Sequence, residues 1–409
     1  MLLSYRSNIL ELKSTLSLIL CLTLLSCGGL STKKDSSFKT IKVGCERIDE
    51  YLSDLQNKSI GIVANHSTII GKTHLVDSLL FRGVLITKIF SPEHGFRGDA
   101  ADGVLIENDV DSRTGIPVIS LYANKRKPSK EDLAGIDLMI FDIQDVGVRF
   151  YTYISTMHYL MEACAENAIP LIVLDRPNPN GFYVDGPVLD TNFRSFVGMH
   201  PVPVVHGMTV GEFALMINGE GWLNKGAQCN LTVIPCYNYS HDSTYTLPVS
   251  PSPNLPNQTS VYLYPSLCFL EGTVVSIGRG TDFPFQVFGH PSFPDMGFHF
   301  TPESRPTSSI NPPLKDQKCY GFDLRDYTDK YFLDTRSINL SWLIFAYQTF
   351  PDKQKFFNNY FNTLAGNRTL RVQIEKGFDE QTIRNSWMSD IEQFMEVRQK
   401  YLLYPDFSR

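Results

Sequence analysis

The chain has 409 residues, enough for two domains, and a formal net charge of −6 with acidic and basic residues interspersed. No run of Lys or Arg marks a nucleic-acid-binding face, so a polyanionic partner is not expected. The apolar, aromatic and charged fractions, 43%, 12% and 20%, are ordinary for a globular enzyme and give no sign of long disorder.

The first 26 residues have the pattern of an export signal. Arg6 and Lys13 precede an apolar run over residues 16–25, which is too short for a stable membrane-spanning anchor. The run ends in Leu-Leu-Ser-Cys-Gly, which resembles a bacterial lipobox, and this resemblance implies that Cys27 is lipidated and begins the mature chain. We therefore expect an exported lipoprotein, held on the membrane at the periplasmic side of a bacterial envelope, with residues 27–40 as a tether. A cleaved signal beside an incidental cysteine is the alternative.

From residue 41 to about 239, short apolar runs alternate with helical patterns. We predict strands at 59–64, 84–90, 117–122, 138–143 and 170–174, and helices at 73–81, 129–133, 152–167 and 209–223. Buried strands alternating with helices imply a parallel sheet covered on both faces, a doubly wound, Rossmann-like α/β domain. No GxGxxG follows the first strand, so we expect no dinucleotide cofactor.

Four prolines between residues 248 and 256 interrupt regular structure, and we place a domain boundary near residue 245. Residues 41–245 then form the Rossmann-like domain. Residues 246–409 form a smaller α+β domain, with helices expected at 261–270, 340–350 and 382–402.

Six cysteines follow Cys27 and are widely spread, without the spacing of a zinc site, so no metal is expected. Export and an even count permit disulfide pairing. Cys164 lies inside a helical pattern and fits equally well as a small core residue.

Polar side chains follow four of the predicted strands at their carboxyl ends, where open α/β sheets bind ligands. They are Asn65 and His66; Glu93, His94 and Arg97; Asp142, Gln144, Asp145 and Arg149; and Asp175 and Arg176. His206, Glu212 and Arg279 are weaker candidates from the flanking region and the second domain. Glu212 follows Thr209 by three residues and also fits a helix capping box.

Glu93 is the leading catalytic candidate. We expect Phe90 and Phe96 to enclose its carboxyl, raise its pKa and allow it to act as a general acid. A salt bridge to Arg97 or Arg113 that shapes the loop is the structural alternative.

A second carboxylate for glycosidic chemistry would come from Asp142 or Asp145, which could equally cap the following helix. Tyr151 and Tyr153 offer faces for sugar stacking, or are half-buried core residues.

The strings SPEHGFRG at 91–98, FDIQDVGVRFYTY at 141–153, LDRPNPNG at 174–181 and HGMTVGE at 206–212, together with Asn65-His66, resemble the exo-β-N-acetylmuramidase family, formerly a domain of unknown function. The resemblance covers most of residues 45–409 and implies a Rossmann-like domain, a smaller C-terminal domain and an active-site cleft between them. It implies an exo-acting glycosidase that releases N-acetylmuramic acid from the non-reducing ends of peptide-free peptidoglycan fragments during cell-wall turnover. Glu93 matches the glutamate that the family places in its cleft.

The lactyl carboxylate of that sugar suits a guanidinium, and Arg149, Arg176 and Arg279 are the candidates. The expected substrate-binding set also contains Asn65, His66, His94, Arg97, Gln144, Tyr151, Tyr153, Asp175 and His206. The nucleophile stays open between the sugar's acetamido group, a protein carboxylate and a tyrosine.

Two other functions remain as alternatives. One is a non-catalytic lipoprotein that binds cell-wall sugars in the same cleft. The other is an esterase or amidase, against which stands the lack of a GxSxG elbow and of a zinc-ligand motif.

Overall fold

The structure is a computed structural model that describes residues 40–93, 95–97, 109–122 and 125–408. Cys27, the expected signal and tether, and His94 lie outside the described residues.

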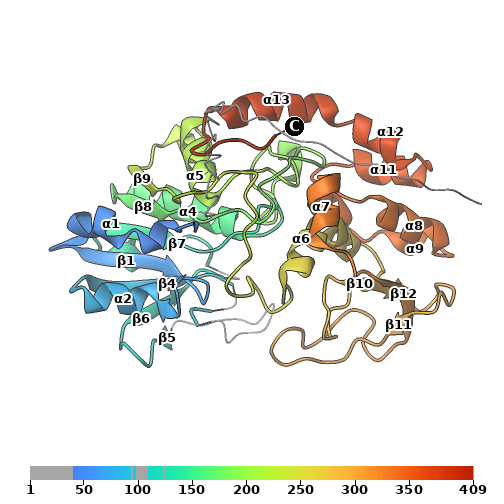
Figure 1. Cartoon of the computed structure of the whole chain (residues 1–409), viewed down its shortest axis with the longest axis horizontal. Helices are drawn as coiled ribbons and strands as arrows, with labels where there is room; N and C mark the ends of the chain where they lie inside the picture. The colour runs from blue at the N-terminus through green and yellow to red at the C-terminus, as the bar shows by residue number, and fades with distance from the viewer. Residues whose placement is uncertain (1–39, 94, 98–108, 123–124, 409) are drawn as a thin grey trace, which may run out of the picture. The chain divides into compact units, whose positions relative to one another are not determined.

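A seven-stranded sheet organises the first part of the chain (Figure 1). Its order is β5 (Asp109–Val110), β6 (Pro117–Ser120), β4 (Leu85–Ser91), β1 (Ser59–Ala64), β7 (Leu138–Asp142), β8 (Leu171–Leu174) and β9 (Leu231–Ile234). All neighbours pair in parallel except the short edge strand β5, which runs antiparallel to β6. The predicted parallel sheet is confirmed, whereas β5 and β9 were not predicted.

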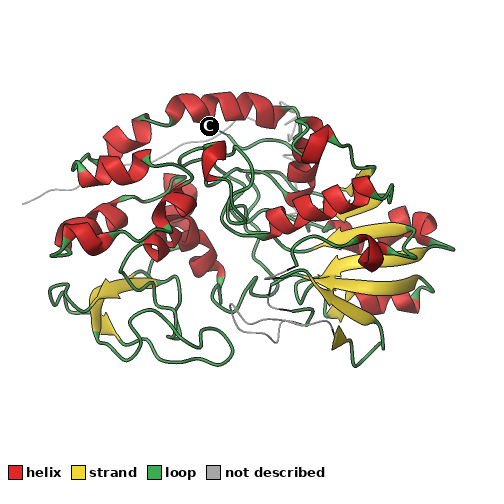
Figure 2. Ribbon diagram, turned by 180° about the vertical axis from the view of Figure 1, so that it is seen from behind, coloured by secondary structure: helices red, strands yellow, loops and turns green. Residues whose placement is uncertain are grey.

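Side chains alternate between the two faces of the sheet. In β7, Leu138 and Ile140 pack in one apolar cluster with α1 (Ile48–Leu55) and α2 (Leu75–Phe81). Met139 and Phe141 pack in the other with α4 (Tyr153–Glu166) and α5 (Val210–Gly219). Helices therefore cover both faces (Figure 2), and the doubly wound α/β prediction is confirmed.

Two capping boxes begin helices of this part. Ser129 and Asp132 cap α3 (Lys130–Leu133), and Thr209 and Glu212 cap α5, as predicted for Glu212. The predicted helix at 73–81 begins two residues late, because residues Thr73–His74 form β3, which pairs with β2 (Ile69–Ile70).

The rest of the chain is α+β, as expected. Its small antiparallel sheet has the order β10 (Val287–His290), β12 (Cys319–Asp323), β11 (His299–Phe300). Its helices are α6 (Gln258–Leu267), α7 (Asp329–Thr335), α8 (Ser341–Thr349), α9 (Lys353–Phe356), α10 (Phe361–Ala365), α11 (Thr369–Glu375), α12 (Glu380–Asn385) and α13 (Met388–Gln399). Short 3₁₀ turns are η1 (Gly44–Glu46), η2 (Thr191–Phe193), η3 (Asn224–Gly226) and η4 (Cys268–Gly272). The boundary near residue 245 stays a prediction.

The single helix expected at 382–402 is wrong. Trp387 interrupts it, because its ring is buried and its Nε1 donates a hydrogen bond to Asp185 Oδ1 at 3.2 Å. The chain therefore forms α12 and α13, with a break at residues 386–387.

The last residues return to the large sheet. Arg398 of α13 donates to the carbonyl of Gly207, and the backbone N–H of Leu403 donates to Glu212 Oε1 at 2.8 Å. The Tyr404 hydroxyl donates to Asp175 Oδ2 at 2.5 Å and accepts from the Cys236 N–H at 2.7 Å.

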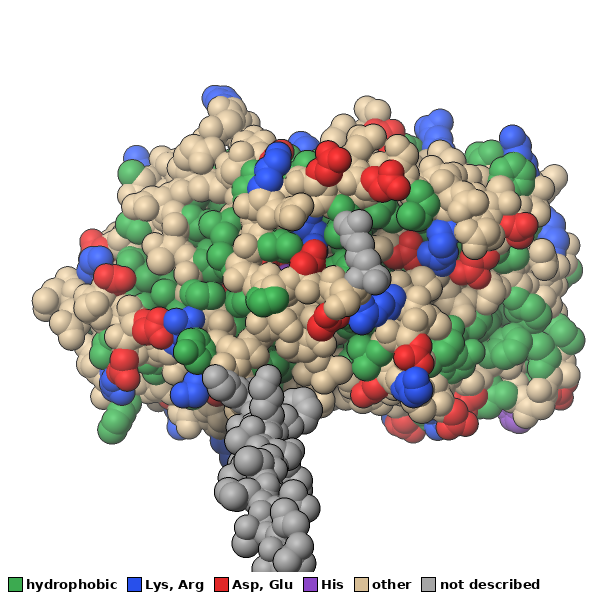
Figure 3. Space-filling model, turned by 45° about the horizontal axis from the view of Figure 1, so that its top comes forward, with side chains coloured by type: hydrophobic (Ala, Val, Ile, Leu, Met, Phe, Trp, Pro, Cys, Tyr) green, Lys and Arg blue, Asp and Glu red, His purple; other side chains and the backbone are tan. Residues whose placement is uncertain are grey.

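Charges of both signs are interspersed on the face that Figure 3 shows. No helix of the described part is long and apolar enough to cross a membrane. The same residues contain no group of three or more His, Cys, Asp or Glu placed to hold a metal ion.

The six cysteines of the described part are free and buried. The disulfide pairing that export would permit is therefore absent among them. Cys164 packs in the core beside α4, in line with its structural alternative.

Candidate active site

A cavity of about 620 Å³ opens beyond the carboxyl edge of the large sheet. Both parts of the chain line it, through Glu93, Tyr122, Arg126, Phe150–Tyr153, Ser195–Val197, Ser252, Asn254, Leu255, Tyr264, Glu271, Thr273, Val275, Ile277, Arg279, Phe285, Pro313, Tyr360 and Thr363. Its volume lies in the range of small-molecule sites, and aromatic rings supply much of its wall, which suits the faces of sugar rings.

Glu93 reaches the cavity from the loop after β4. The loop turns sharply, with Gly95 at φ +78° and its N–H donating to the carbonyl of Pro92. Glu93 is partly buried, and its charge contributes to raising the pKa of Tyr153 and of Tyr360, after burial itself in both cases. Glu93 and both tyrosines line the same cavity.

The expected enclosure of Glu93 by Phe90 and Phe96 is wrong. Phe90 packs in the core beside α4, and Phe96 packs on the opposite face against His74, with ring centroids 4.7 Å apart. The wall next to Glu93 is made of tyrosines instead.

Tyr151 and Tyr153 both line the cavity, at the start of α4. Their rings meet edge to face at 4.8 Å. The Tyr151 hydroxyl donates to the carbonyl of Pro251 at 2.8 Å, and Asn65 Nδ2 donates to the Tyr153 hydroxyl at 3.0 Å. Asn65 is fully buried, so it supports Tyr153 from behind and does not line the cavity.

Glu271 and Arg279 contribute an ion pair to the cavity wall, with Arg279 Nε 2.7 Å from Glu271 Oε1. Between them the chain lines the cavity with every second residue: Glu271, Thr273, Val275, Ile277 and Arg279. Glu271 was missed in the sequence, although the alternation in EGTVVSIGR could have revealed it.

Arg126 was missed as well. Its guanidinium lies over the ring of Phe196, 4.2 Å from the centroid, and both residues line the cavity. Arg126 is exposed and makes no ion pair with any residue in the described part of the chain.

Asp142 and Arg176 form an ion pair in the core. They form a fully buried bidentate pair, with Arg176 Nε 2.6 Å from Oδ1 and Nη2 2.8 Å from Oδ2. Neither lines the cavity. The expected roles of Asp142 in catalysis and of Arg176 in carboxylate binding are therefore corrected, because each charge satisfies the other inside the fold.

Asp145 and Gln144 lie behind the cavity and do not line it. Burial raises the pKa of Asp145 to about 7, and its Oδ2 accepts the N–H of Gly147 at 2.7 Å. Gln144 Nε2 donates to the carbonyls of Asp145 and Pro177, each at 2.8 Å. The expected sugar contact of Gln144 is thus replaced by backbone support.

Arg149, Asp175 and His206 are also core residues. The Arg149 guanidinium donates to four carbonyls, of Pro187, Val202, Leu364 and Ala365, and burial lowers its pKa to about 9. Asp175 accepts from the Thr209 hydroxyl and the Gly211 N–H at the start of α5, each at 2.7 Å, and burial raises its pKa to about 6. Burial lowers the pKa of His206 to about 3. None of the three lines the cavity.

His66 and Arg97 lie at other places. His66 borders a separate hollow of about 400 Å³, with Nε2 2.7 Å from the carbonyl oxygen of Ser250. Arg97 forms a two-point ion pair with Asp111, at 3.1 Å and 2.9 Å, that fixes the loop after β4. Among the expected site residues that the structure describes, Glu93, Tyr151, Tyr153 and Arg279 are the ones that line the cavity.

Comparison with known proteins adds independent findings. A family model described as exo-beta-N-acetylmuramidase NamZ, N-terminal, matches residues 60–259, and its C-terminal counterpart matches residues 262–404. The peptidoglycan beta-N-acetylmuramidase NamZ of Bacillus subtilis (strain 168) is 36% identical over 375 residues, which cover 87% of this chain and 89% of the relative.

Two crystal structures of DUF1343 family proteins from Bacteroides fragilis NCTC 9343 are similar to the fold. One has 46% identity and a TM-score of 0.84, covering 90% of this chain and 99% of the other. The second has 30% identity and a TM-score of 0.71, with coverages of 89% and 99%.

Proposed function

The chain belongs to the exo-β-N-acetylmuramidase NamZ family, and on that basis we propose that Glu93 is the general acid of its reaction. The protein is an exo-acting glycosidase that cleaves N-acetylmuramic acid from peptidoglycan. The observation that carries the role of Glu93 is its place on the cavity wall, at the carboxyl edge of the parallel sheet, in a cavity that Tyr151, Tyr153 and Tyr360 also line.

Cleavage of a glycosidic bond leaves an electron pair on the departing sugar's oxygen. A carboxylic acid beside that oxygen can donate its proton as the bond breaks, and its carboxylate can then take a proton from the attacking water. In this cavity Glu93 would do both, while Tyr151 and Tyr153 offer ring surface to the sugar.

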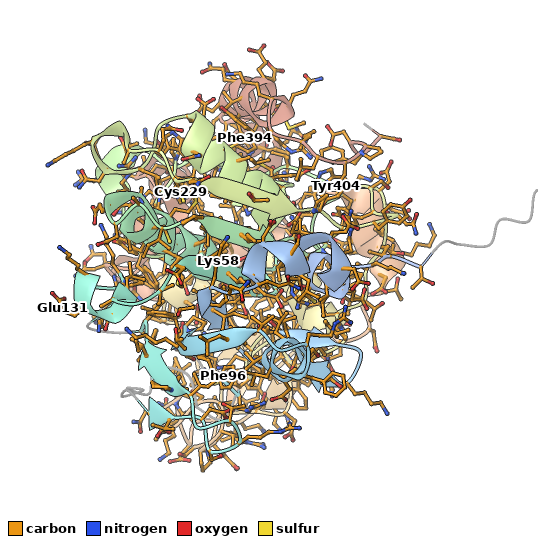
Figure 4. All side chains as sticks on the ribbon, turned by 90° about the vertical axis from the view of Figure 1, so that its left-hand side faces the viewer. Lys58, Phe96, Glu131, Cys229, Phe394 and Tyr404 are labelled. Atoms are coloured by element: carbon orange, nitrogen blue, oxygen red, sulfur yellow. The ribbon has the colours of Figure 1, made fainter. Side chains whose placement is uncertain are left out.

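The test is Glu93→Gln, which keeps the shape of the side chain and removes the acid. Turnover of natural glycan should fall by roughly 10²–10⁴, the usual worth of general acid catalysis. A muramide with a very good leaving group needs less protonation, so its loss should be smaller. Glu131→Gln is the control, because Glu131, labelled in Figure 4, is exposed on α3 and does not line the cavity. Wild-type turnover of natural glycan by Glu93→Gln would refute the proposal.

We further propose that the cavity binds the N-acetylmuramic acid unit at the non-reducing end of a peptide-free fragment, and that Arg126 binds its lactyl carboxylate. Arg126 lines the cavity without an ion-pair partner among the described residues. Arg279, by contrast, is paired with Glu271. Both Arg149 and Arg176 are buried. A guanidinium that is not engaged by a protein carboxylate can bind the substrate's carboxylate bidentately.

The lipid anchor at Cys27 and the periplasmic location are also proposals. They rest on the apolar run and the Leu-Ser-Cys-Gly junction alone.

A further inference from the structure

The cavity wall contains a second glutamate besides Glu93. Among the lining residues that the structure describes, Glu93 and Glu271 are the carboxylates. They come from distant parts of the chain, Glu93 from the loop after β4 and Glu271 from η4. Asp142, Asp145 and Asp175, which end or follow strands at the same edge of the sheet, are buried and do not line the cavity.

Arg279 fixes the direction of the Glu271 carboxylate. Arg279 Nε lies 2.7 Å from Glu271 Oε1, and the Arg279 guanidinium stacks on Phe285, 5.1 Å from the ring centroid. Among the described residues, Glu271 Oε2 has only the weak Cys268 thiol as a donor, at 3.5 Å. One carboxylate oxygen is therefore anchored, and the other can face a substrate.

The backbone that carries Glu271 is also held in place. Asn358 Nδ2 donates to the carbonyl of Glu271 at 3.2 Å, and the Asn358 N–H donates to that of Gly272 at 3.0 Å. A Cβ on Gly272 would lie 2.4 Å from the Cα of Phe361, so only glycine permits this close contact between η4 and α10. Such support from neighbouring groups is what a catalytic side chain needs to keep its geometry.

Tyr360 lines the cavity together with the two glutamates. Its pKa is raised by burial first, and then by the charges of Cys268, Glu271 and Glu93. Both carboxylates therefore act on one hydroxyl that lines the same cavity. Glycosidases work with two such carboxyl groups on either side of the scissile bond.

We propose that Glu271 is the second catalytic carboxylate, which stabilises the positive charge that develops at the anomeric carbon. This inference rests on the proposed function, in which Glu93 is the acid. When the bond between the anomeric carbon and the leaving oxygen breaks, its electron pair goes to that oxygen, which takes the proton of Glu93. The positive charge left on the anomeric carbon and ring oxygen faces Glu271 Oε2. Water then bonds to the anomeric carbon and gives a proton to Glu93. Arg279 acts as a positioning residue.

The experiment compares Glu271→Gln and Glu93→Gln on natural glycan and on an aryl N-acetylmuraminide with a very good leaving group. Loss of charge stabilisation should lower kcat by roughly 10²–10³ on both substrates, with little change in KM. A good leaving group does not help Glu271→Gln, because the charge at the anomeric carbon still develops, whereas it should partly restore Glu93→Gln.

Glu375→Gln is the matched control, because Arg371 Nε lies 2.8 Å from Glu375 Oε1 in a similar ion pair outside the cavity. It should retain wild-type kcat on both substrates. Arg279→Gln should lower kcat less than Glu271→Gln does, since it leaves the carboxylate in place but unanchored. If Glu271→Gln does not fold, Glu271→Asp keeps the charge one methylene farther back and should lower kcat, not KM.

The inference is overturned if Glu271→Gln raises KM alone, or if a good leaving group restores its kcat. It is also overturned if Glu271→Asp retains wild-type kcat. A different result would show that Glu93 is not the general acid: Glu93→Gln would keep its activity on natural glycan, while Glu271→Gln would lose it.

Discussion

Replacing Asp145 with asparagine should remove much of the fall in stability that the protein undergoes between pH 4 and pH 8. The side chain is 6% exposed; its Oδ2 accepts the Gly147 N–H, and its Oδ1 has no hydrogen-bond partner among the described residues. Burial raises its pKa from 3.8 to about 7. Asparagine has the same shape and an oxygen for the Gly147 N–H, but it does not ionise.

The size and sign follow from proton linkage. Between pH 4 and 7 the unfolded chain has lost the Asp145 proton and the folded protein has kept it, so the free energy of unfolding decreases as pH rises. Below this window both states hold the proton, and above it neither does. At about 1.4 kcal/mol per pKa unit, the stability lost over the window is at most about 4 kcal/mol.

Urea unfolding at several pH values measures this directly. Asp145→Asn should match the wild type near pH 4 apart from a constant offset, and should gain up to about 4 kcal/mol relative to it by pH 8. Asp54→Asn, at an exposed position of α1, is the control and should follow the wild-type pH dependence. A constant difference between Asp145→Asn and the wild type at every pH would show that the carboxyl ionises normally in the folded state.

Three further predictions follow from single side chains. Arg126→Ala should lower kcat/KM for muramides by roughly 10²–10⁴ and should leave kcat/KM for the matched N-acetylglucosaminide within about threefold of the wild-type value. Equal losses on both sugars would exclude carboxylate recognition. Arg113→Ala is the control, because Arg113 is exposed and does not line the cavity. Arg149→Met should cost about 3 kcal/mol or more in urea unfolding, because four buried carbonyls lose their donor, and a change below about 1 kcal/mol would contradict this. Cys27→Ala should move the protein from the membrane pellet to the soluble fraction, and unchanged fractionation would rule out the lipid anchor.

The sheet could be predicted because its strands are continuous apolar runs. β1, β7 and β8 are buried almost throughout, and β4 is buried over its last three residues, which leaves a strong signal in the sequence. β9 escaped prediction because only Ile234 is fully buried in its four residues, and β5 has two exposed residues. Edge strands carry a weak apolar pattern.

The site could be predicted only in part. Polar residues at strand ends either face the ligand or satisfy one another inside the fold, and the sequence does not separate these uses. Glu93 faces the cavity, whereas Asp142 at the end of β7 is neutralised by Arg176. Glu271 lies in η4 of the second part, where no strand-end rule applies. The folding of the chain brings it to the same cavity as Glu93, which the sequence alone does not show.

The C-terminal tail also determines when this chain can finish folding during synthesis. Asp175 and Cys236, which follow β8 and β9, both hydrogen-bond to the Tyr404 hydroxyl. Glu212 on α5 accepts a hydrogen bond from the N–H of Leu403. These partners are synthesised more than 160 residues after the groups to which they hydrogen-bond. The Rossmann-like part therefore lacks these hydrogen bonds, including the one that the buried Cys236 N–H donates, until residues 403–404 have been synthesised, and a chain shortened before Leu403 would lack them permanently.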